Sequence, residues 1–382
     1  RATGGPGGPT RGTGANVSQR EDLANFITMI TRDETPFTSD IGKSSATAIY
    51  HEWQTDTLEA PGDSRIPEGQ DFLAPAAGGA SATPTVGSKF AESGPQRTRL
   101  GNYTQINGKT IAVSGTRRAV DQAGVADEYA YQLKKRGTEL RRDIEFDMIH
   151  GYNVSAAIGA QNGDARSAGG YQSFINSTDT CTYVGEFTQP ATGTGSKPNN
   201  DGTEIPRATI APSSSAAPAR GSLALTDIDS VMQKIYEQGG KATKIMVSPK
   251  IRRDFSDLMV SDTGVVRNID AGGQLRQSVD VYMSDFGEIM VMPNYIMGLS
   301  NVIDNMLGSN HASTKFTSSG RPDMANFSAL IYDPMWFATA YLRPLQEVDV
   351  GQQGDSTKGM MVEECTLEVR NPLGCGAIYG LN

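Results

Sequence analysis

A single long amphipathic segment, residues 119–152, constrains this chain more than any other feature. Apolar or small residues recur along it at spacings of three and four, which keeps them on one side of a 3.6-residue helical period. They are Ala126, Ala130, Leu133, Gly137, Leu140, Ile144 and Met148. A helix from Asp121 to His150 would be roughly 45 Å long at about 1.5 Å per residue. Such a rod needs another layer of structure along its apolar face.

The opposite face of this predicted helix carries five basic and six acidic residues. DNA-recognition helices are usually net basic, because neutralising phosphates supplies much of their affinity. The balance therefore argues against nucleic-acid recognition. It leaves three readings open: a solvated face, ion pairs with neighbouring chains, or pairs within the helix such as Lys135 with Glu139 and Arg141 with Glu145.

Bulk composition excludes several classes of protein. The 382 residues suffice for two or three domains, and no apolar run approaches the roughly 18 residues that span a bilayer. The net charge of −9 does not favour tight, sequence-independent binding to nucleic acid. Cys181, Cys365 and Cys375 lie far apart, so the spacing indicates neither a disulfide framework nor a zinc site. We expect reduced, buried thiols.

The first 46 residues combine a Gly- and Pro-rich tail with one short predicted helix. Ser18 and Glu21 form a capping-box pattern ahead of an apolar face, and the helix should end before Pro36. The GKSS sequence at 42–45 is part of a phosphate-binding pattern, but that pattern requires glycine where Phe37 stands. We reject a phosphate-binding loop here.

An extended β region is predicted over residues 47–115. Residues 47–58 alternate like a strand, and Asn107-Gly108 has the composition of a type I′ hairpin turn. Acidic residues predominate at 52–71 and basic residues at 84–118. The two limbs could pair with each other across a ribbon or with neighbouring chains.

The second half of the chain predicts a further globular unit. Residues 159–221 are rich in Gly, Ser and Thr and suggest a surface insertion or linker. A helix, a strand and a second helix follow at about 225–260, with strands at 264–269, 278–284, 287–293 and 327–332. Strands at 335–350 and 359–370 should return to pack on the long helix.

No pattern in the sequence indicates an active site. His51, His150 and His311 are remote from one another and from the cysteines, and neither GxSxG nor HExxH occurs. The acidic clusters lack the spacing of an EF-hand. We expect no catalytic residues, no cofactor and no metal site.

The order of arm, β region, long helix, helix–strand–helix unit and returning strands resembles the HK97-type major capsid proteins of tailed phages. Within that group, several stretches are similar to capsid proteins related to phage SU10. They are SQREDLANFITMITRDETPFTSDIG, TAIYHEWQTDTL, GNYTQINGKTIAVSG and ELRRDIEFDMIHG. The stretch LALTDIDSVMQKIYEQGGKATKIMVSPKIRRDFSDLM is similar to the axial subdomain of those proteins.

This resemblance implies an α+β fold of the HK97 type with six parts. They are an N-terminal arm at 1–46, an extended loop at 47–117, a peripheral subdomain with a spine helix at 118–158, an insertion at 159–221, an axial subdomain at 222–330, and peripheral return strands at 331–382. The extended loop would lie over a neighbouring subunit.

The resemblance also implies a structural function. Copies would assemble through pentamers and hexamers into an icosahedral shell around phage double-stranded DNA, in the host cytoplasm, and remain in the virion. Portal, scaffolding or decoration proteins would be partners, DNA would be touched only weakly, and no membrane would be involved. The alternatives are an encapsulin-like compartment and, more remotely, a soluble hydrolase with an unrecognised site.

Charged residues outside the predicted core are the candidates for contacts between subunits. They are Glu68, Arg97, Arg99, Arg136 and Arg141. Some relatives join subunits by an isopeptide bond from a lysine of the extended loop to an asparagine of the peripheral subdomain. In this chain the position after Lys358, which should hold that asparagine, is Gly359. We therefore expect no such cross-link.

Overall fold

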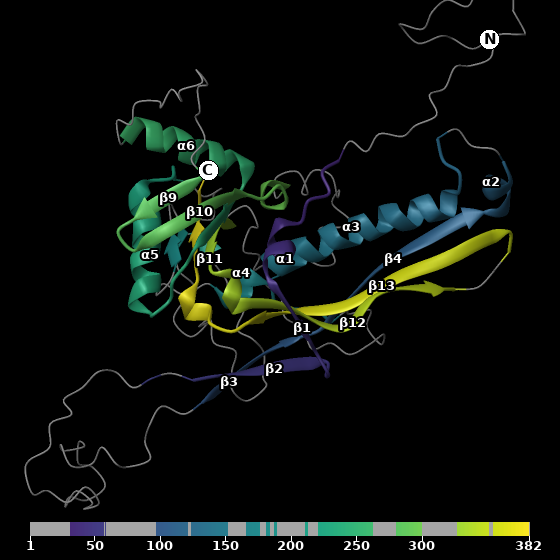
Figure 1. Ribbon diagram of the computed structural model, residues 1–382, viewed down its shortest axis with the longest axis horizontal. Coiled ribbons are helices and arrows are strands. Elements are labelled where there is room, and N and C mark those ends of the chain that lie inside the picture. Colours follow the sequence, from purple (N-terminus) through teal and green to yellow (C-terminus); the bar gives the residue numbers. More distant parts are fainter. Residues whose placement is uncertain are drawn as a thin grey trace, which may run out of the picture.

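The computed structural model shows a mixed α+β protein built from two β-sheets that share one core (Figure 1). A four-stranded sheet carries one long helix, and a six-stranded sheet carries two shorter ones. The structure describes residues 31–56, 58, 97–120, 124–151, 166–175, 181–183, 187–188, 211–212, 221–262, 280–299, 327–350 and 354–381.

The four-stranded sheet combines segments from both ends of the chain. Its order is β1 (Gly42–Ser45), β12 (Phe337–Asp349), β13 (Ser356–Val369) and β4 (Gln105–Ser114). β1 runs parallel to β12, and the other pairs are antiparallel. The predicted return of two late strands to the long helix is therefore confirmed, and GKSS is a strand.

The long helix, α3 (Glu128–His150), lies across one face of this sheet but is shorter than the sequence pattern predicts. A separate short helix, α2 (Gly115–Ala119), precedes it and ends where Val120 becomes extended. Gly124 then has a φ of 83°, and the Asp127 carboxylate accepts the Tyr129 N–H as the N-cap of α3. At about 1.5 Å per residue, α3 is roughly 34 Å long rather than 45 Å.

The inward face of α3 follows the predicted period only from its second turn onward. Ala126 and Ala130 are exposed, because they lie near the end of the sheet. The buried members of the predicted face are Gly137, Leu140, Ile144 and Met148. They share a core with Ile111 and Val113 of β4. Gly137 allows close approach, since a Cβ there would lie 3.2 Å from the Met361 Cε.

The prediction of a hairpin turn at Asn107-Gly108 is wrong. β4 continues straight through both residues, which pair with Glu363 and Val362 of β13. A type I′ turn needs positive φ at both central residues, and neither residue has it. Ten residues of ladder with β13 outweigh the local turn preference. The hairpin is instead formed by β2 (Tyr50–Thr55) and β3 (Thr98–Tyr103).

The six-stranded sheet lies beyond one end of α3. Its order is β5 (Cys181–Tyr183), β14 (Gly376–Tyr379), β11 (Phe327–Tyr332), β8 (Lys244–Val247), β10 (Gly287–Pro293) and β9 (Val281–Ser284). β14 pairs with β11, so the final strand joins this sheet rather than the sheet under α3. The predicted strand at 264–269 lies outside the described residues.

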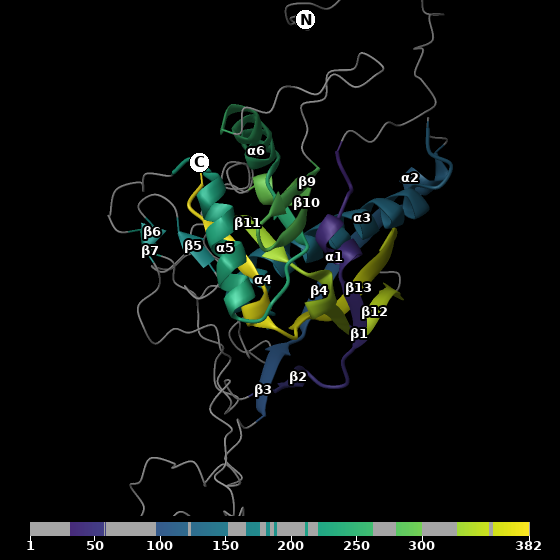
Figure 2. The ribbon, with the colours of Figure 1, turned by 60° about the vertical axis from the view of Figure 1, so that its left-hand side comes forward.

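The predicted order of helix, strand and helix is confirmed, and the two helices cover one face of the second sheet. α5 (Leu225–Glu237) and α6 (Pro249–Asp262) flank β8 in the chain and share a core with it. Figure 2 shows both helices beside the strands of this sheet. α5 ends just before Gly239, which has a φ of 79°. The Asp227 carboxylate accepts the Ala224 N–H at 3.0 Å, so the acidic side chain caps the start of α5.

Part of the predicted surface insertion at 159–221 is core. α4 (Tyr171–Phe174) is buried, and the Tyr171 hydroxyl donates to the carbonyl oxygens of Ile331 and Gly376 at 3.0 and 2.8 Å. The sequence pattern failed here because two aromatic residues in a polar stretch carry no periodicity. Two short strands, β6 (Phe187–Thr188) and β7 (Ala211–Pro212), pair elsewhere in this region.

The end of the predicted arm is also core. The sequence pattern predicted that a helix would end before Pro36. In the structure a helix, α1 (Pro36–Asp40), begins at this residue, because proline is well suited to the first turn of a helix. Phe37 is fully buried and packs edge-on against Tyr171, Tyr332 and Phe337. The predicted helix after Ser18 lies outside the described residues. In the described part of the chain, 3₁₀ turns lie at Ile296–Leu299, Pro334–Trp336 and Pro372–Gly374.

Candidate interaction surfaces

The predicted contact residues fall in two separate places. Arg97 and Arg99 lie at the β2–β3 hairpin, which projects from the body, and Arg136 and Arg141 lie on α3 (Figure 1). Glu68 lies outside the described residues. The structure therefore does not gather these side chains into one site.

The acidic and basic limbs meet within the chain at the hairpin. Arg97 Nε lies 3.4 Å from Asp56 Oδ2, and both side chains are more than half exposed. Arg99 stands opposite Gln54 in the ladder and is exposed. An exposed pair of this kind contributes about 0 to 1 kcal/mol. The acidic and basic limbs therefore form an ion pair with each other at Asp56 and Arg97.

Buried polar contacts fix the base of the hairpin to β13. Asn102 is fully buried, and its side-chain amide donates to the carbonyl oxygens of Gly169 and Leu367, each at 2.8 Å. His51 Nε2 lies 3.3 Å from Glu368 Oε2. Burial alone would raise the pKa of Glu368, but hydrogen bonds from Arg370 and His51 outweigh it and leave that pKa lowered.

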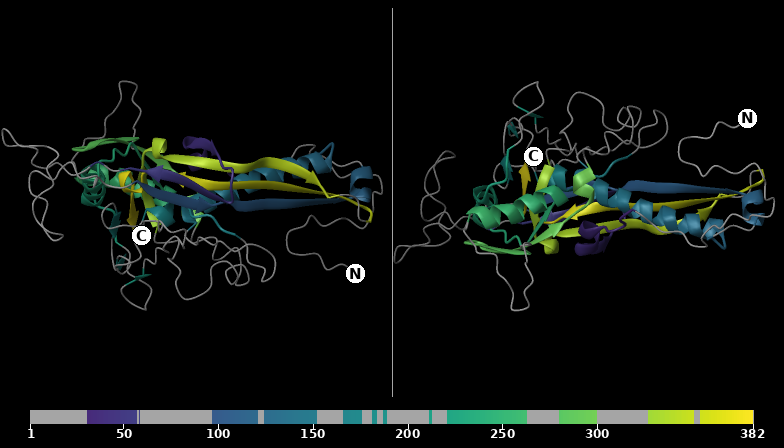
Figure 3. Two further views of the ribbon diagram at one scale, coloured as in Figure 1. Left: turned by 90° about the horizontal axis from the view of Figure 1, so that it is seen from below. Right: turned by 90° about the horizontal axis from the view of Figure 1, so that it is seen from above.

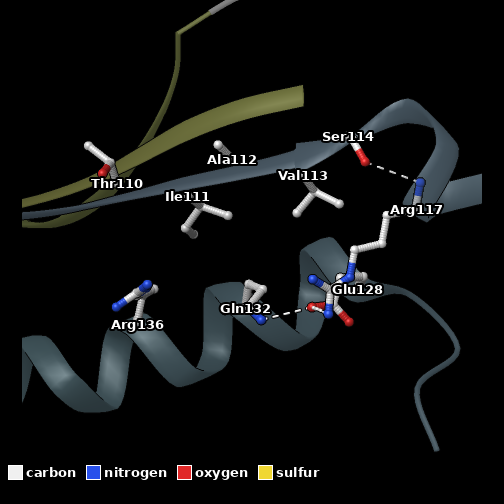
Figure 4. A pocket seen from close by; sticks show the side chains of 9 residues that line it. All are labelled: Thr110, Ile111, Ala112, Val113, Ser114, Arg117, Glu128, Gln132 and Arg136. Atoms are coloured by element: carbon white, nitrogen blue, oxygen red, sulfur yellow. Dashed lines mark hydrogen bonds and ion pairs between the residues drawn. The ribbon is translucent and has the colours of Figure 1, made fainter. Parts of the chain in front are cut away.

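A cleft of about 390 Å³ separates β4 from the first turns of α3 (Figure 4). Glu128, one of the six acidic residues expected on the outer face of the helix, is buried and lines this cleft. Its carboxylate pairs with Arg117 at 3.0 Å and accepts a hydrogen bond from Gln132 Nε2 at 2.8 Å. Arg136 lines the same cleft.

The remaining charges of α3 pair differently from the sequence prediction. Arg136 Nη1 contacts Glu139 Oε2 at 2.6 Å, where the pattern favoured Lys135. Lys109 of β4 forms an ion pair with Asp143. Arg141 is exposed near Glu363 of β13. Burial raises the pKa of Glu363, and the positive charge of Arg141 partly offsets that rise.

Glu145 is the residue that the sequence pattern misplaces most. It is fully buried rather than paired with Arg141. Its two oxygens accept the backbone N–H groups of Phe37 and Thr38 at 2.8 and 2.7 Å, and the Asn294 side-chain amide at 2.9 Å. The available signal was Ile149, one turn further along and also fully buried, which widens the inward arc of α3.

The position expected to carry a cross-linking asparagine is sterically occupied. A Cβ at Gly359 would overlap the Tyr129 hydroxyl. That hydroxyl donates to Glu347 Oε1 at 2.7 Å, and this hydrogen bond is the largest influence raising the pKa of Tyr129 to about 12. Glycine at 359 lets β13 approach the first turn of α3.

His150, Cys365 and Cys375 are buried. Burial lowers the pKa of His150 to about 4 and raises the pKa of the Cys365 thiol. His311 lies outside the described residues. Over the ranges described above, no three His, Cys, Asp or Glu side chains are grouped so that they could hold a metal ion. No helix among these residues is long and apolar enough to cross a membrane.

Comparison with known proteins gives consistent matches. A family model described as SU10 major capsid protein matches residues 9–382. The major capsid protein of Escherichia phage Phieco32 is 26% identical over 266 residues, which cover 65% of this chain and 68% of that protein.

Solved capsid structures share the fold at low sequence identity. The capsid of cyanophage P-SCSP1u matches with a TM-score of 0.52 and 10% identity, over 99% of this chain and 100% of that one. The mature capsid of bacteriophage PhiM1 matches with a TM-score of 0.52 and 12% identity, over 94% and 91%. A chain from Mycobacterium phage Bobi matches with a TM-score of 0.52 and 10% identity, over 96% of each.

Proposed function

The chain belongs to the SU10 major capsid protein family, and on that premise we propose how its parts build a shell. It is a structural, non-enzymatic protein of the virion, and its copies form the phage capsid shell. The alternatives of an enzyme or a cargo compartment have no observation in their favour.

In our proposal the two sheets are the two subdomains of an HK97-type subunit. α3 with the four-stranded sheet is the peripheral subdomain, drawn from 118–158 and 331–382, and includes the strand β4. The six-stranded sheet with α5 and α6, mostly from 222–330, is the axial subdomain and also takes β14. The protruding β2–β3 hairpin supports assigning 47–117 to the extended loop.

The proposed shell is icosahedral, with pentamers and hexamers enclosing double-stranded DNA. The net charge of −9 supports weak, non-specific contact between the wall and the packaged DNA. Portal, scaffolding or decoration proteins are proposed partners, and Arg97, Arg99, Arg136, Arg141 and Glu68 are proposed contacts between copies. The observation that carries this proposal is the long helix laid across a sheet that joins a second, helix-covered sheet (Figure 3).

Electron microscopy of the purified full chain tests this function. We expect closed shells with five-fold and quasi-six-fold capsomers under assembly conditions. A chain that stays monomeric under those conditions would contradict the proposal. Shells that lack five-fold vertices would remove the icosahedral arrangement only.

A further inference from the structure

The β2–β3 hairpin joins the body of the subunit through two short stretches of chain. One is segment 46–49, which links β1 to β2, and the other is the single residue Thr104, which lies between β3 and β4 (Figure 1). Before Thr104 the chain pairs with β2, and after it the chain pairs with β13. Thr104 is therefore the pivot at which the chain passes from the hairpin to the four-stranded sheet.

Every polar group of this pivot has a partner. Thr104 lies outside both ladders and is fully buried, so its backbone groups need partners elsewhere. Its N–H donates to the Ile49 carbonyl oxygen at 2.8 Å, and its hydroxyl donates to Glu364 Oε1 at 2.9 Å. Its carbonyl oxygen accepts from Arg166 Nε at 2.6 Å. Three separate segments of the chain thus hold the pivot.

Arg166 binds the pivot and the four-stranded sheet with one rigid group. While its Nε donates to Thr104, its Nη2 pairs with Glu364 of β13. A guanidinium is planar and presents its donors in fixed directions, so the two bonds fix both acceptors relative to each other. The side chains of Arg166 and Glu364 are 12% and 5% exposed. Arg343 Nε pairs with the second oxygen of Glu364 at 2.8 Å.

The residues that follow Arg166 contact the strands on either side of the pivot. Gly169 exchanges two hydrogen bonds with the Asn102 side chain on β3, both at 2.8 Å. The Ala168 N–H donates to Gln105 Oε1 on β4 at 3.1 Å. Segment 166–169, which we call the bracket, therefore contacts the end of β3, the pivot and the start of β4.

The bracket is itself fixed to the end of α3. The carbonyl oxygen of Gly151, the residue after α3, accepts the Gly170 N–H at 2.5 Å. Glycine is required for this approach, since a Cβ at Gly170 would lie 2.5 Å from the Asp147 carbonyl oxygen. The buried helix α4 follows directly. The position of the core is thus passed to the hairpin through the bracket.

The contacts on the other strand of the hairpin constrain its direction less. His51 Nε2 lies 3.3 Å from Glu368, and the ring of Trp53 lies 6.1 Å from that of Phe174. Apolar packing is non-directional, whereas charge-assisted hydrogen bonds from a guanidinium have a set geometry. A buried ion pair often stabilises a fold no better than apolar side chains of similar size. The pair of Arg166 with Glu364 is therefore better explained by orientation than by stability.

We propose that Arg166 is a positioning residue for assembly, which with Glu364 fixes the direction of the β2–β3 hairpin before subunits meet. The inference rests on the proposed assignment of 47–117 to the extended loop and adds how that loop is oriented within one subunit. A hairpin that already points in one direction loses less conformational freedom when a contact forms. The bracket thereby raises the yield of shells from inside the subunit.

Spin-label distance measurements on free subunits test the orientation. Gln54 on the hairpin and Lys134 on α3, both exposed, are each replaced by a keto-bearing amino acid that takes a spin label, so the native cysteines need no change. We expect one narrow distance distribution in the labelled chain and a distribution about twice as wide after Arg166→Ala. Arg252→Ala is the matched control, because the Arg252 side chain is 14% exposed and pairs with Asp280 at 2.8 Å on α6.

Equal widths for Arg166→Ala and Arg252→Ala would overturn the proposal, because the contacts of His51 and Trp53 would then suffice to orient the hairpin. Thr104→Val gives an independent test should Arg166→Ala fail to fold. Valine is close to threonine in shape and removes only the hydroxyl bond to Glu364. We expect it to widen the distribution too, and an unchanged width would likewise overturn the proposal.

Shell yield separates this inference from the function on which it rests. Arg166→Ala should lower the yield of closed shells severalfold relative to Arg252→Ala. A lower yield with an unchanged width of the distance distribution would show that Arg166 does not act by orienting the hairpin. Failure of the unsubstituted chain to form any shell would instead remove the proposed function, whatever the distance measurements show.

Discussion

At the scale of single residues, Glu145 holds together three segments that are far apart in the chain. It joins the first turn of α1, the C-terminal part of α3 and the loop after β10 through three hydrogen bonds. The first N–H groups of any helix lack acceptors within the helix. In α1, the Glu145 carboxylate accepts hydrogen bonds from two of these groups, those of Phe37 and Thr38. Burial raises the pKa of Glu145, and the bonds from Thr38, Phe37 and Asn294 only partly offset that rise.

Glu145→Ala should destabilise the subunit strongly. It leaves buried donors on Phe37, Thr38 and Asn294 without an acceptor, at about 1 to 3 kcal/mol each. We expect the free energy of unfolding, measured by urea denaturation of unassembled subunits, to fall by about 3 kcal/mol or more. Glu139→Ala on the same helix breaks a partly exposed pair and should cost less than about 0.5 kcal/mol. Equal losses for the two variants would contradict the role assigned to Glu145.

The pKa of Glu145 also predicts a direction for the pH dependence of stability. A carboxyl group whose pKa is higher in the folded state binds its proton more tightly there than in the unfolded chain. Its contribution is fully present below the unfolded pKa and is lost as pH rises through the folded value. Relative to Glu145→Gln, the wild type should therefore lose unfolding free energy as pH rises from about 4 towards neutrality. A difference between the two proteins that grows in the wild type's favour with rising pH would refute this.

Gly359 leads to a prediction about covalent chemistry. Glycine has no side chain that could form an isopeptide bond, and a Cβ at this position would meet the Tyr129 hydroxyl. Mature particles, boiled and reduced, should therefore run as intact subunit monomers on a denaturing gel. A ladder of covalent multimers would show that subunits are joined, and mass spectrometry of its peptides would locate the bond.

At the scale of secondary-structure elements, the β2–β3 hairpin combines a fixed base with an exposed end. Asn102 and His51 attach the base to the sheet, whereas Arg97 and Asp56 pair in solvent at the other end. Contacts that contribute little to the stability of the subunit can still matter for contacts between subunits. Substitutions at the exposed end of the hairpin can therefore test assembly without affecting the folding of the subunit.

Arg97→Glu should impair assembly more than folding. The exposed pair with Asp56 contributes at most about 1 kcal/mol, so the melting temperature of the free subunit should change little. Shell yield, measured by sedimentation, should fall. Arg253→Glu is a matched control, because Arg253 is also exposed and lies 3.5 Å from an aspartate. If Arg97→Glu assembles as well as Arg253→Glu, Arg97 is not a contact between copies.

At the scale of the whole molecule, the two sheets are joined by one continuous apolar core. Leu330 and Tyr332 of the second sheet belong to the same buried cluster as Leu140 of α3 and Leu367 of β13. Lys244 pairs with Asp40, which also accepts a hydrogen bond from the Tyr332 hydroxyl at 3.1 Å. α1 is therefore wedged between the two halves.

This shared core predicts cooperative unfolding. The unassembled subunit should unfold in one step, since neither sheet can lose its packing without exposing the core of the other. Urea transitions followed by tryptophan fluorescence and by far-ultraviolet circular dichroism should coincide. Two separated transitions would show that the sheets are independent domains.

Local patterns in the sequence determined much of this fold. The 3.6-residue period located α3 and α5, and Pro249 and Gly239 marked where helices begin and end. The alternating strands at 287–293 and 327–332 were found at their observed positions. The phage capsid family was also recognisable from the chain alone. The signals for single helices and strands each lie within one continuous stretch of the chain, where propensity and periodicity act.

Tertiary structure alone decided the rest, because the deciding contacts join residues far apart in the chain. Pairing with β13 turned Asn107-Gly108 from a turn into a strand. Docking of α1 made Glu145 a buried acceptor rather than a surface charge. The position of α3 determined which face of the long sheet was covered and left Val348 exposed on the other. A strand's periodicity shows that its two faces differ, but only the elements packed against the strand determine which face is buried.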